Sequence, residues 1–518
     1  MVRLRNSGAV LTLFLVATIM PVHPQEAEDK RIELTLEEVI HEVVRSNPSV
    51  KEARIEWLIA SRSEKAAWGD FVPDLVAGYT RSSEYRESTV IEILQQNFET
   101  ELAQDRHEYS TGIQGLLFTG TSYQFGLSVT KIENSLTQDG EYQSFLGFSA
   151  EQPLLKGATS GAPLAPIRVA RQETAVAYQE YRRQLMSVVS QAESAYWNLV
   201  YAQQRLELAR SSTSIARLIA EDTKARRGAG RASELDTLEA DAGVAVRRAQ
   251  QADAEQNLIE ASSQLLILLG SGLYGDRGRV VALDRLLSRQ PEATGDELRA
   301  ISLEWALRAH PDLLVRRREL ERETIVYRYQ KDQALPELNL TASYGLNGLG
   351  DTVDQSLSNF QDRTYTSWSV GLNLRIPLPV PVRQKNELAV AALRRKLADQ
   401  RLAASYYEIR SAIDSMILRI STLQTRIENA QRVADAKSNL LDVEMQRLAG
   451  GRSDIRRVLQ VEEELAQAKQ LVLESAVRYR EAQMQLAFVR GSVLRDLGLE
   501  QIGRDGITWS GELQDLGR

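Results

Sequence analysis

The sequence predicts an α+β membrane protein that joins long α-helical hairpins to β-strands and uses this plan in two internal repeats. Three observations support this fold class. The stretches Ile167–Arg227 and Val382–Ala449 contain neither glycine nor proline, so each predicts a helix of about 90–100 Å. Short segments of alternating apolar and polar residues lie between the helical stretches. Landmarks at prolines and glycines recur in the two halves of the chain.

Composition excludes several function classes. The 518 residues carry a formal net charge of −7, so there is no basic excess that would indicate nucleic-acid binding. Cysteine is absent, which rules out disulfides, thiolate metal sites and a cysteine nucleophile. The four histidines, His23, His41, His107 and His310, are scattered without metal-ligand spacing. We therefore expect no metal and no cofactor.

Residues 1–24 have the features of a secretory signal peptide. Arg3 and Arg5 precede an apolar run from Ala9 to Met20, which is shorter than the roughly 20 residues a spanning helix needs. Pro21-Val22-His23-Pro24 offers no clear cleavage site, and an uncleaved signal anchor is the alternative. No later apolar run is long enough for a transmembrane helix, so membrane insertion would require β-strands.

The internal repeat rests on matched prolines and glycines. Asn47-Pro48 precedes Pro73 by 25 residues, and His310-Pro311 precedes Pro336 by the same interval. Gln152-Pro153-Leu154 corresponds to Ile376-Pro377-Leu378 where each long helix is entered. At the far end of each long helix, the segment 230–235 matches 451–455 with a one-residue slip. The repeats thus run from about residue 34 to 270 and from 300 to 491.

These matches divide the mature chain into successive segments. In repeat 1 we expect N-terminal helices at 25–70, strands and extracellular loops at 71–153, and a long helical hairpin at 160–270. A linker follows at 271–297. In repeat 2 we expect helices at 298–334, strands and a loop at 335–377, and a second long hairpin at 382–495, followed by a C-terminal tail at 496–518.

The second long helix has a heptad seam, because its apolar residues are spaced four and three apart throughout. Such spacing makes helices pack as a left-handed coiled coil. The many small residues between seams favour a closed helical cylinder over a two-stranded rod, although an ordinary coiled-coil dimer remains the alternative. The seam consists of Leu402, Tyr406, Ile409, Ile413, Met416, Ile420, Leu423, Ile427, Ala430 and Ala434, and a weaker one includes Leu185, Val189, Ala192, Tyr196, Leu199 and Leu206.

The alternating segments predict strands with one apolar and one polar face. The regular ones are 123–129, 338–346 and 368–376, with further strands at 71–80 and 146–150. The longer ones are about 9–11 residues, which suits a tilted strand that crosses a bilayer. Lipid does not tolerate open sheet edges, and one chain offers only about four to six strands, so closure requires several chains. A soluble sandwich is the alternative.

At this point the chain resembles the TolC-like outer-membrane factors, the outer membrane efflux proteins of tripartite efflux and type I secretion systems. No single motif is decisive, but their order, spacing and duplication are specific. The resemblance covers nearly all of the mature chain and rests on Asn47-Pro48, Phe71-Val72-Pro73-Asp74-Leu75, Gln152-Pro153-Leu154-Leu155, Ala195-Tyr196-Trp197-Asn198-Leu199 and the duplicated tips.

The resemblance implies a homotrimer in the outer membrane of a Gram-negative bacterium. Its strands would combine into one barrel in outer-membrane lipid, and its helices would form a periplasmic tunnel. The inner end would close like an iris and dock a periplasmic adaptor (membrane fusion protein) and an inner-membrane pump of the RND, ABC or MFS type. Substrates would pass unchanged, so no enzymatic activity is expected. A periplasmic coiled-coil adaptor or structural spacer is the alternative function.

The chain departs from the family pattern in its strands. Family members usually contribute four strands per chain. Here residues 109–130, centred on Phe118-Thr119-Gly120-Thr121, predict an additional hairpin. We expect it either to add strands to the barrel or to form an extracellular flap.

The second departure concerns charge at the tips, which we expect to form the periplasmic mouth. Family members often carry acidic residues just after the second tip, where this chain has arginines. We hypothesise that acidic residues of the first tip pair across protomers with Arg452, Arg456 and Arg457 and latch the mouth; the alternative is that these charges only solvate the tips. The gate candidates are Gly230, Arg231, Glu234, Asp236, Glu239, Gly451, Arg452, Asp454, Arg456 and Arg457.

Overall fold

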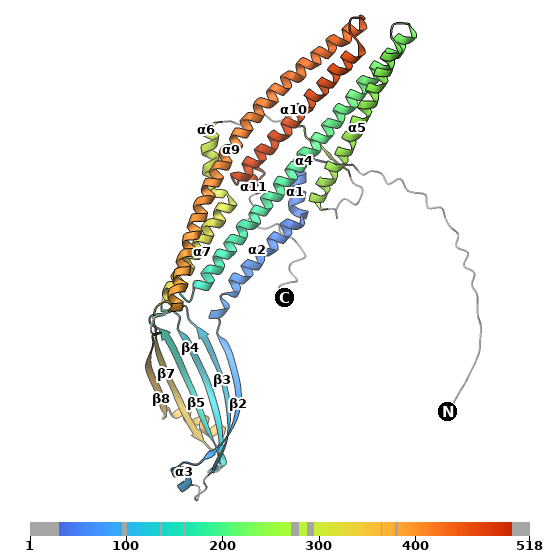
Figure 1. Ribbon diagram of the computed structural model, residues 1–518. Helices are drawn as coiled ribbons and strands as arrows, with labels where there is room; N and C mark the ends of the chain where they lie inside the picture. The colour runs from blue at the N-terminus through green and yellow to red at the C-terminus, as the bar shows by residue number, and fades with distance from the viewer. Residues whose placement is uncertain are drawn as a thin grey trace, which may run out of the picture.

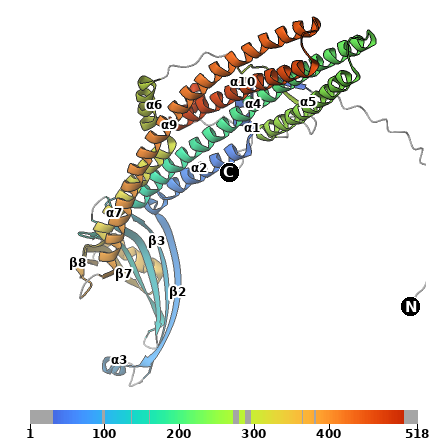
Figure 2. The same cartoon turned by 45° about the horizontal axis from the view of Figure 1, so that its top comes forward.

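The computed structural model describes residues 31–95, 101–134, 137–158, 161–270, 279–286, 295–363, 365–378 and 382–499. The chain is elongated, with a helical part at one end and a β-sheet at the other (Figure 1). Turning the molecule shows the same division along its long axis (Figure 2). The predicted signal peptide and most of the predicted C-terminal tail lie outside the described residues.

Two short helices of repeat 1 precede the sheet. Helix α1 (Leu36–Ser46) begins at a capping box in which Thr35 and Glu38 each bind the other's backbone N–H. Helix α2 (Pro48–Ala66) begins at Asn47, whose side chain accepts from the Ser49 N–H. Proline suits the first position of α2, where its missing N–H would have no helical partner.

Repeat 2 uses the same plan with one change. Helices α6 (Asp296–Ala309) and α7 (Pro311–Gln333) meet at His310, which occupies the place of Asn47 but makes no side-chain cap bond. Gly270 and Gly491, both at positive φ, end the two long hairpins against the ends of α1 and α6. A side chain at Gly491 would clash with the backbone of Ala309 and His310.

The long helices confirm the predictions made from glycine- and proline-free stretches. Helix α4 (Ala165–Gly228) returns through α5 (Glu234–Leu269), and α9 (Val382–Ala449) returns through α10 (Ile455–Val489), followed by the short helix α11 (Val493–Asp496). The heptad seam of α9 is inward-facing, because each of its members is buried or half-buried. Two short loops, which we call tip 1 (229–233) and tip 2 (450–454), join the hairpin helices at the end farthest from the sheet (Figure 1).

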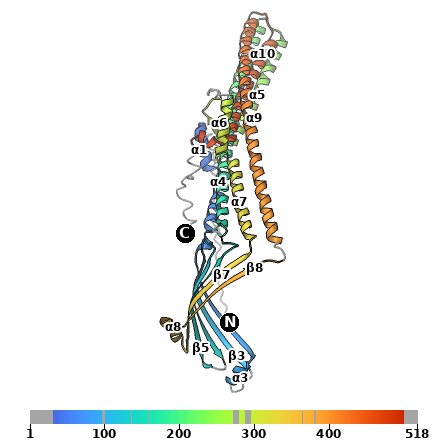
Figure 3. The same ribbon diagram turned by 90° about the vertical axis from the view of Figure 1, so that its left-hand side faces the viewer.

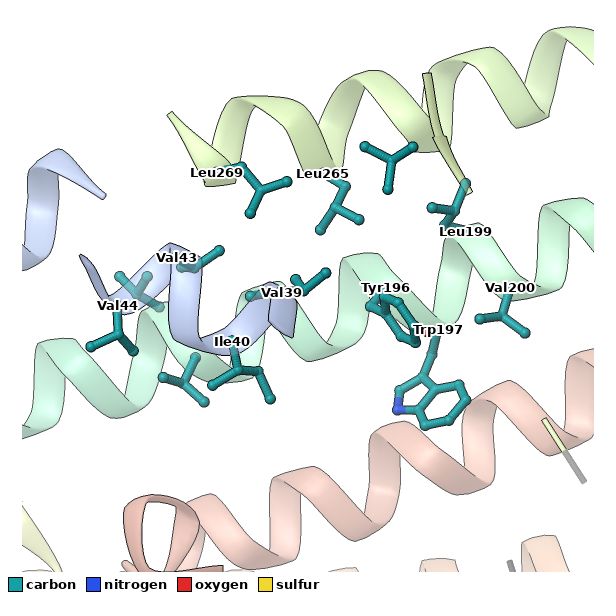
Figure 4. Close-up of a cluster of buried hydrophobic side chains, with 14 of the residues drawn as sticks. Val39, Ile40, Val43, Val44, Tyr196, Trp197, Leu199, Val200, Leu265 and Leu269 are labelled. Atoms are coloured by element: carbon teal, nitrogen blue, oxygen red, sulfur yellow. The ribbon is translucent and has the colours of Figure 1, made fainter. Parts of the chain in front are cut away.

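The largest apolar core lies midway along the helical part. Val39, Ile40, Val43 and Val44 of α1 pack there against α4 and α5 (Figure 4). The weaker seam of α4 supplies Tyr196 and Leu199, and α5 supplies Leu265 and Leu269, all four fully buried. Burial of each such side chain contributes about 1.5–3 kcal/mol. This core holds the short helices of repeat 1 to its long hairpin.

Two short strands were not predicted. Strand β1 (Arg31–Leu34) pairs in parallel with β6 (Arg279–Ala282). Strand β1 lies in the segment predicted as N-terminal helices and β6 in the segment predicted as a linker, and neither strand was expected there. The alternation in Arg-Ile-Glu-Leu of β1 covers only four residues, which is too short to indicate a strand. The strand that pairs with β1 is about 250 residues away in the sequence. The Tyr196 hydroxyl donates to Asp284 at 2.6 Å, and Asp284 also accepts from the Leu36 N–H.

The main sheet is antiparallel and has six strands in the order β2-β3-β4-β5-β7-β8. Its bounds are β2 (Asp74–Glu87), β3 (Glu101–Leu116), β4 (Ser122–Asn134), β5 (Thr137–Pro153), β7 (Glu337–Gly350) and β8 (Thr366–Arg375). The strand predicted from Phe71 begins instead at Asp74, because Phe71 ends a 3-10 turn, η1 (Gly69–Phe71), and Pro73 has no N–H for a ladder.

The two faces of the sheet differ sharply in polarity. One row of paired residues crosses all six strands and is apolar throughout: Leu75, Ile113, Phe125, Phe148, Tyr344 and Trp368. All six are exposed, from 45% at Ile113 to 78% at Leu75. The next row lies on the opposite face and is polar throughout: Asp74, Gln114, Gln124, Ser149, Ser343 and Ser369.

The additional hairpin predicted at 109–130 is formed by β3 and β4, which are central to the sheet. It is not a flap, because its turn lies at the helical end. There the Phe118 ring packs at a tilt against Phe71, with 4.9 Å between centroids, and edge-to-face against Trp68, with 6.1 Å between centroids. Gly120 takes a φ of +83° in this turn, a conformation that glycine adopts without steric cost.

Two short helices lie in the connections at the far end of the sheet. Helix α3 (Val90–Gln95) follows β2, and α8 (Val353–Asp362) connects β7 to β8 (Figure 3). Only a loop was expected where α8 lies. Helix α8 begins at a Thr352 cap and covers Gly348 and Gly350 of β7. Among the helices in the described part, none is both long and apolar enough to cross a membrane.

Candidate functional site at the two helical tips

Tip 1 follows from a glycine and a capping residue. Gly230 takes a φ of +72°, and the Arg231 N–H donates to the Arg226 carbonyl at 2.8 Å, which closes the end of α4. Ser233 then starts α5 through a capping box with Asp236. The Ser233 N–H and hydroxyl both bind the Asp236 carboxylate and hold its pKa below the usual range.

Tip 2 has the same geometry. Gly451 takes a φ of +70°, and the Arg452 N–H donates to the Arg447 carbonyl at 2.8 Å. Asp454 caps α10 by accepting from the Arg457 N–H at 2.7 Å. Both capping residues therefore follow the positive-φ glycine by three positions, so the predicted one-residue slip was wrong. It arose because Ser453 was matched to Ser233, although Asp454 does the capping.

Each hairpin carries its own ion pair near the tip. Lys224 of α4 binds Asp241 of α5 at 2.7 Å, and Lys437 of α9 binds Glu464 of α10. The Lys437 ammonium lowers the pKa of the Glu464 carboxyl. The Lys224–Asp241 pair is about half exposed and the Lys437–Glu464 pair about one-third exposed, and ion pairs so open to solvent stabilise a hairpin only weakly.

Different contacts join one hairpin to the other. Arg456 of α10 forms an ion pair with Glu239 of α5, which raises the pKa of the Arg456 guanidinium. The Arg226 guanidinium of α4 donates to the Leu448 carbonyl of α9 at 2.6 Å. Beneath them lies an apolar cluster that includes Ala216, Ala240 and Val458. The tips are therefore held side by side within one chain.

A buried ionic group lies deeper between the hairpins. The Arg247 guanidinium of α5 binds Glu462 of α10 at 2.6 Å and also pairs with Glu463. The Ser212 hydroxyl of α4 donates to Glu462, and the Thr213 hydroxyl donates to the Arg247 carbonyl. The Arg247 and Glu462 side chains are only 6% and 3% exposed. Three of the four long helices thus meet at one charge cluster.

This cluster was not predicted from the sequence, although a signal was present. The buried residues of α5 follow heptad spacing through Ala240, Val244, Arg247, Ala254 and Leu258. Glu462 lies likewise between Val458 and Leu465 in the inward-facing residues of α10. A buried ion pair is indicated when one helix has a charged residue at a seam position and another helix has a residue of opposite charge at a seam position.

The structure brings only some of the gate candidates together. Glu239 and Arg456 contact each other, whereas Glu234 lies 3.6 Å from Arg227 of its own hairpin. Asp236 and Asp454 act as helix caps, and Arg457 donates to Gln460 of its own helix. Gly230, Arg231, Gly451 and Arg452 shape the turns through backbone geometry.

Within the described ranges, no group of three or more histidine, cysteine or acidic residues is arranged to hold a metal ion. The tips instead carry ion pairs and hydrogen bonds between helices. They occur together with a two-faced sheet whose outer strands, within the described residues, each pair on one side only, and this combination is typical of membrane channels that carry a helical tunnel.

Comparison with known proteins agrees with this class. The sequence model of the outer membrane efflux protein family matches residues 39–271 and 303–492, and the chain belongs to this family. The alkaline protease secretion protein AprF of Pseudomonas aeruginosa is 24% identical over 411 residues, which cover 75% of this chain and 79% of that protein. The protein is thus an outer-membrane channel of the Gram-negative efflux and secretion class.

Solved structures share the fold at low sequence identity. The CmeC outer membrane channel of Campylobacter jejuni has a TM-score of 0.63 at 14% identity, covering 91% of this chain and 90% of that one. The open state of the MtrE outer membrane channel of Neisseria gonorrhoeae has a TM-score of 0.62 at 15% identity, covering 88% of each chain.

Proposed function

We propose that three copies of this chain assemble into a passive export duct. The sheets join into one outer-membrane barrel, with the apolar row from Leu75 to Trp368 facing lipid and the polar row from Asp74 to Ser369 facing the lumen. The helical hairpins form a tunnel into the periplasm, where a periplasmic adaptor and an inner-membrane pump of the RND, ABC or MFS type deliver substrate. The observation that carries this proposal is the complete apolar row, exposed on all six strands.

We further infer that the tips are the periplasmic mouth and that contacts between the hairpins hold it closed. The Glu239–Arg456 pair supports this role, because it joins the two hairpins at their ends and is accessible to solvent, with Arg456 76% exposed. The sequence suggested pairing across protomers, and Arg456 also has an acidic partner in its own chain. A surface pair of this kind adds little to overall stability, but it is enough to shift an open–closed equilibrium by up to about fivefold.

Conductance in planar lipid bilayers tests both steps. We expect the wild-type protein to insert and conduct weakly, with rare full openings. Arg456→Glu should raise the open probability up to about fivefold per pair, and the double exchange Glu239→Arg with Arg456→Glu should restore closure. Lys224→Glu is the matched control, because it breaks an exposed pair within one hairpin and should leave gating unchanged.

Two results would count against the proposal. If Arg456→Glu opens no more often than wild type, the pair does not latch the mouth. If the wild-type protein forms no conducting path and fractionates away from the outer membrane, the adaptor or spacer function would replace the channel.

A further inference from the structure

Helix α8 lies on the apolar face of the sheet, at the end farthest from the helical hairpins (Figure 3). Side chains alternate between the two faces along β7, so Gly348 belongs to the same face as Tyr344 of the apolar row. A Cβ at Gly348 would collide with the Ser356 carbonyl of α8. The Ser144 hydroxyl, which is on the same face of β5, donates to that carbonyl at 3.0 Å. In the proposed channel, α8 therefore lies on the lipid side of the wall.

Close packing against β7 determines which side of α8 faces the sheet. Gly348 and Gly350 carry no side chain, and a Cβ at either position would meet the backbone of α8. Ser356 is fully buried at this contact. The side-chain amide of Asn359, one turn further along the helix, donates to the Leu349 carbonyl of β7 at 2.7 Å. The side of α8 that carries Ser356 and Asn359 therefore rests on the sheet.

The rest of α8 divides into an apolar side and a polar side. Val353, Leu357 and Phe360 follow helical spacing, which places them together on a flank next to the sheet contact. Val353 is 38% exposed and the other two are half-buried, so part of each stays uncovered within the described residues. Asp354 and Ser358 are exposed and lie on the side that points away from the sheet. The helix is therefore amphipathic even while it is packed on the wall.

The strand register places α8 at the edge of the apolar band. Gly350, which α8 covers, continues the row of Arg81, His107 and Lys131 on the same face. The apolar row crosses β7 six residues nearer the helical hairpins, at Tyr344. Charged side chains on a lipid-facing surface cost little near the membrane interface but are costly at the midplane. The row of Gly350 therefore marks the level at which hydrocarbon gives way to headgroups.

We propose that α8 is an interfacial helix that docks on the outer-leaflet lipid around the barrel. Val353, Leu357 and Phe360 contact the acyl chains, and Asp354 and Ser358 lie among the headgroups. An amphipathic helix of this kind buries its apolar side about 5–10 Å into the boundary between headgroups and acyl chains. This inference rests on the proposed channel, in which the apolar row faces lipid. Because α8 leads into the edge strand β8, the docked helix sets the depth of the edge at which neighbouring copies meet.

Lipid fits the apolar side of α8 better than a second copy of the chain does. Leu146 and Leu346 lie on the same face between the row of Gly348 and the apolar row, so an apolar surface continues from the wall to the helix. Neighbouring copies would meet along the edge strands β2 and β8, whereas α8 rests on β7 and β5. The outward side of α8 is polar, which suits a helix that lies in the interface rather than within the hydrocarbon.

Fluorescence quenching by lipid tests the docking. The chain has no cysteine, so a single introduced thiol takes up all of a thiol-reactive fluorophore such as bimane. The full-length protein is reconstituted in vesicles of phosphatidylcholine that carries a nitroxide on its acyl chains. Bimane at Val353→Cys and Leu357→Cys should be quenched at least about twofold more strongly than at Asp354→Cys and Ser358→Cys. The last two variants are matched controls, because they lie on the same helix but on its polar side.

A fluorophore on the wall separates this inference from the proposed function. If Phe125→Cys in the apolar row is quenched but Val353→Cys and Leu357→Cys are quenched no more than the controls, α8 does not dock on lipid, and the channel stands. If Phe125→Cys is not quenched by lipid, the apolar row does not face the bilayer, and the proposed function fails. Iodide in the aqueous phase gives the complementary measurement, because equal iodide quenching on both sides of α8 would place the helix in water and overturn the proposal. Phe360→Cys replaces either apolar-side variant that fails to insert.

Discussion

Arg247 connects the chemistry of single residues to the behaviour of the tips. Its guanidinium is buried between α5 and α10 and is satisfied by two glutamates, with Gln250 at 3.4 Å as a further acceptor. A buried ion pair stabilises little compared with apolar residues of the same shape, but it is costly to break. The main effect of the cluster is therefore to fix the position of one hairpin along the other. Its contribution to the free energy of folding is small.

Replacement of one partner should be far more damaging than replacement of both. We expect Arg247→Met to leave Glu462 buried without its counter-charge and to destabilise the α5–α10 contact by about 3–5 kcal/mol. Hydrogen exchange of the amides in 455–465 measures this as lost protection. The double variant Arg247→Met with Glu462→Leu should regain most of it.

Lys224→Met provides the control at the residue scale, since it removes an exposed pair and should change exchange little. Equal protection in Arg247→Met and wild type would show that the buried cluster does not join the hairpins. At this scale the sequence predicted the turn glycines and the charge reversal between the tips. It did not predict which charges meet, because Glu239 and Arg456 are 217 residues apart.

At the scale of elements, the two helix–proline–helix units differ at one residue. Asn47 caps α2 and also donates to the Leu268 carbonyl at 3.2 Å. His310 stands at the same place, is only 7% exposed, and its Nδ1 has no hydrogen-bond partner. Burial lowers the pKa of this imidazole from its ordinary value of 6.5, and the nearby Asp312 carboxylate opposes the shift only partly.

The lowered pKa predicts a pH-dependent stability. The folded chain holds His310 neutral, whereas the unfolded chain protonates it below about pH 6.5. The stabilising contribution of the neutral ring is thus fully present above pH 6.5 and is lost as the pH falls through the folded pKa. We expect the unfolding temperature of the wild type to fall more between pH 7.5 and pH 5 than that of His310→Asn, which copies the cap of repeat 1.

Tryptophan fluorescence during heating measures the difference between the two proteins. His41→Asn is the matched control, because His41 is exposed on α1 and its replacement should leave the pH dependence unchanged. If His310→Asn and wild type lose stability in parallel, the buried imidazole is not the cause.

The elements themselves were largely predictable where their signal is local. Long helices follow from the absence of glycine and proline, and the strands of the main sheet from strict alternation. Strands β1 and β6 were missed because their pairing is non-local. Helix α8 was missed although Val353, Leu357 and Phe360 follow helical spacing, because this signal spans only about two turns between two strands. The face that the sheet exposes was predicted, since alternation determines it.

At the scale of the whole molecule, the chain is one sector of a larger wall. Within the described residues, β2 pairs only with β3 and β8 only with β7, so both edges of the sheet stay open in a single copy. Open edges and an exposed apolar row are incompatible with an isolated chain in water or in lipid. The sequence predicted that several copies are needed to close the wall. The number of strands that each copy contributes became known only from the strand pairing in the structure.

Cryo-electron microscopy of the protein in lipid nanodiscs tests the central claim most directly. We expect three copies, a closed wall of eighteen strands in which β2 of each copy is hydrogen-bonded to β8 of the next, and a helical tunnel that narrows at the tips. A particle with fewer strands in its wall would contradict the role of all six strands as barrel wall. A coiled-coil dimer whose sheets bury their apolar rows against each other would contradict the channel itself.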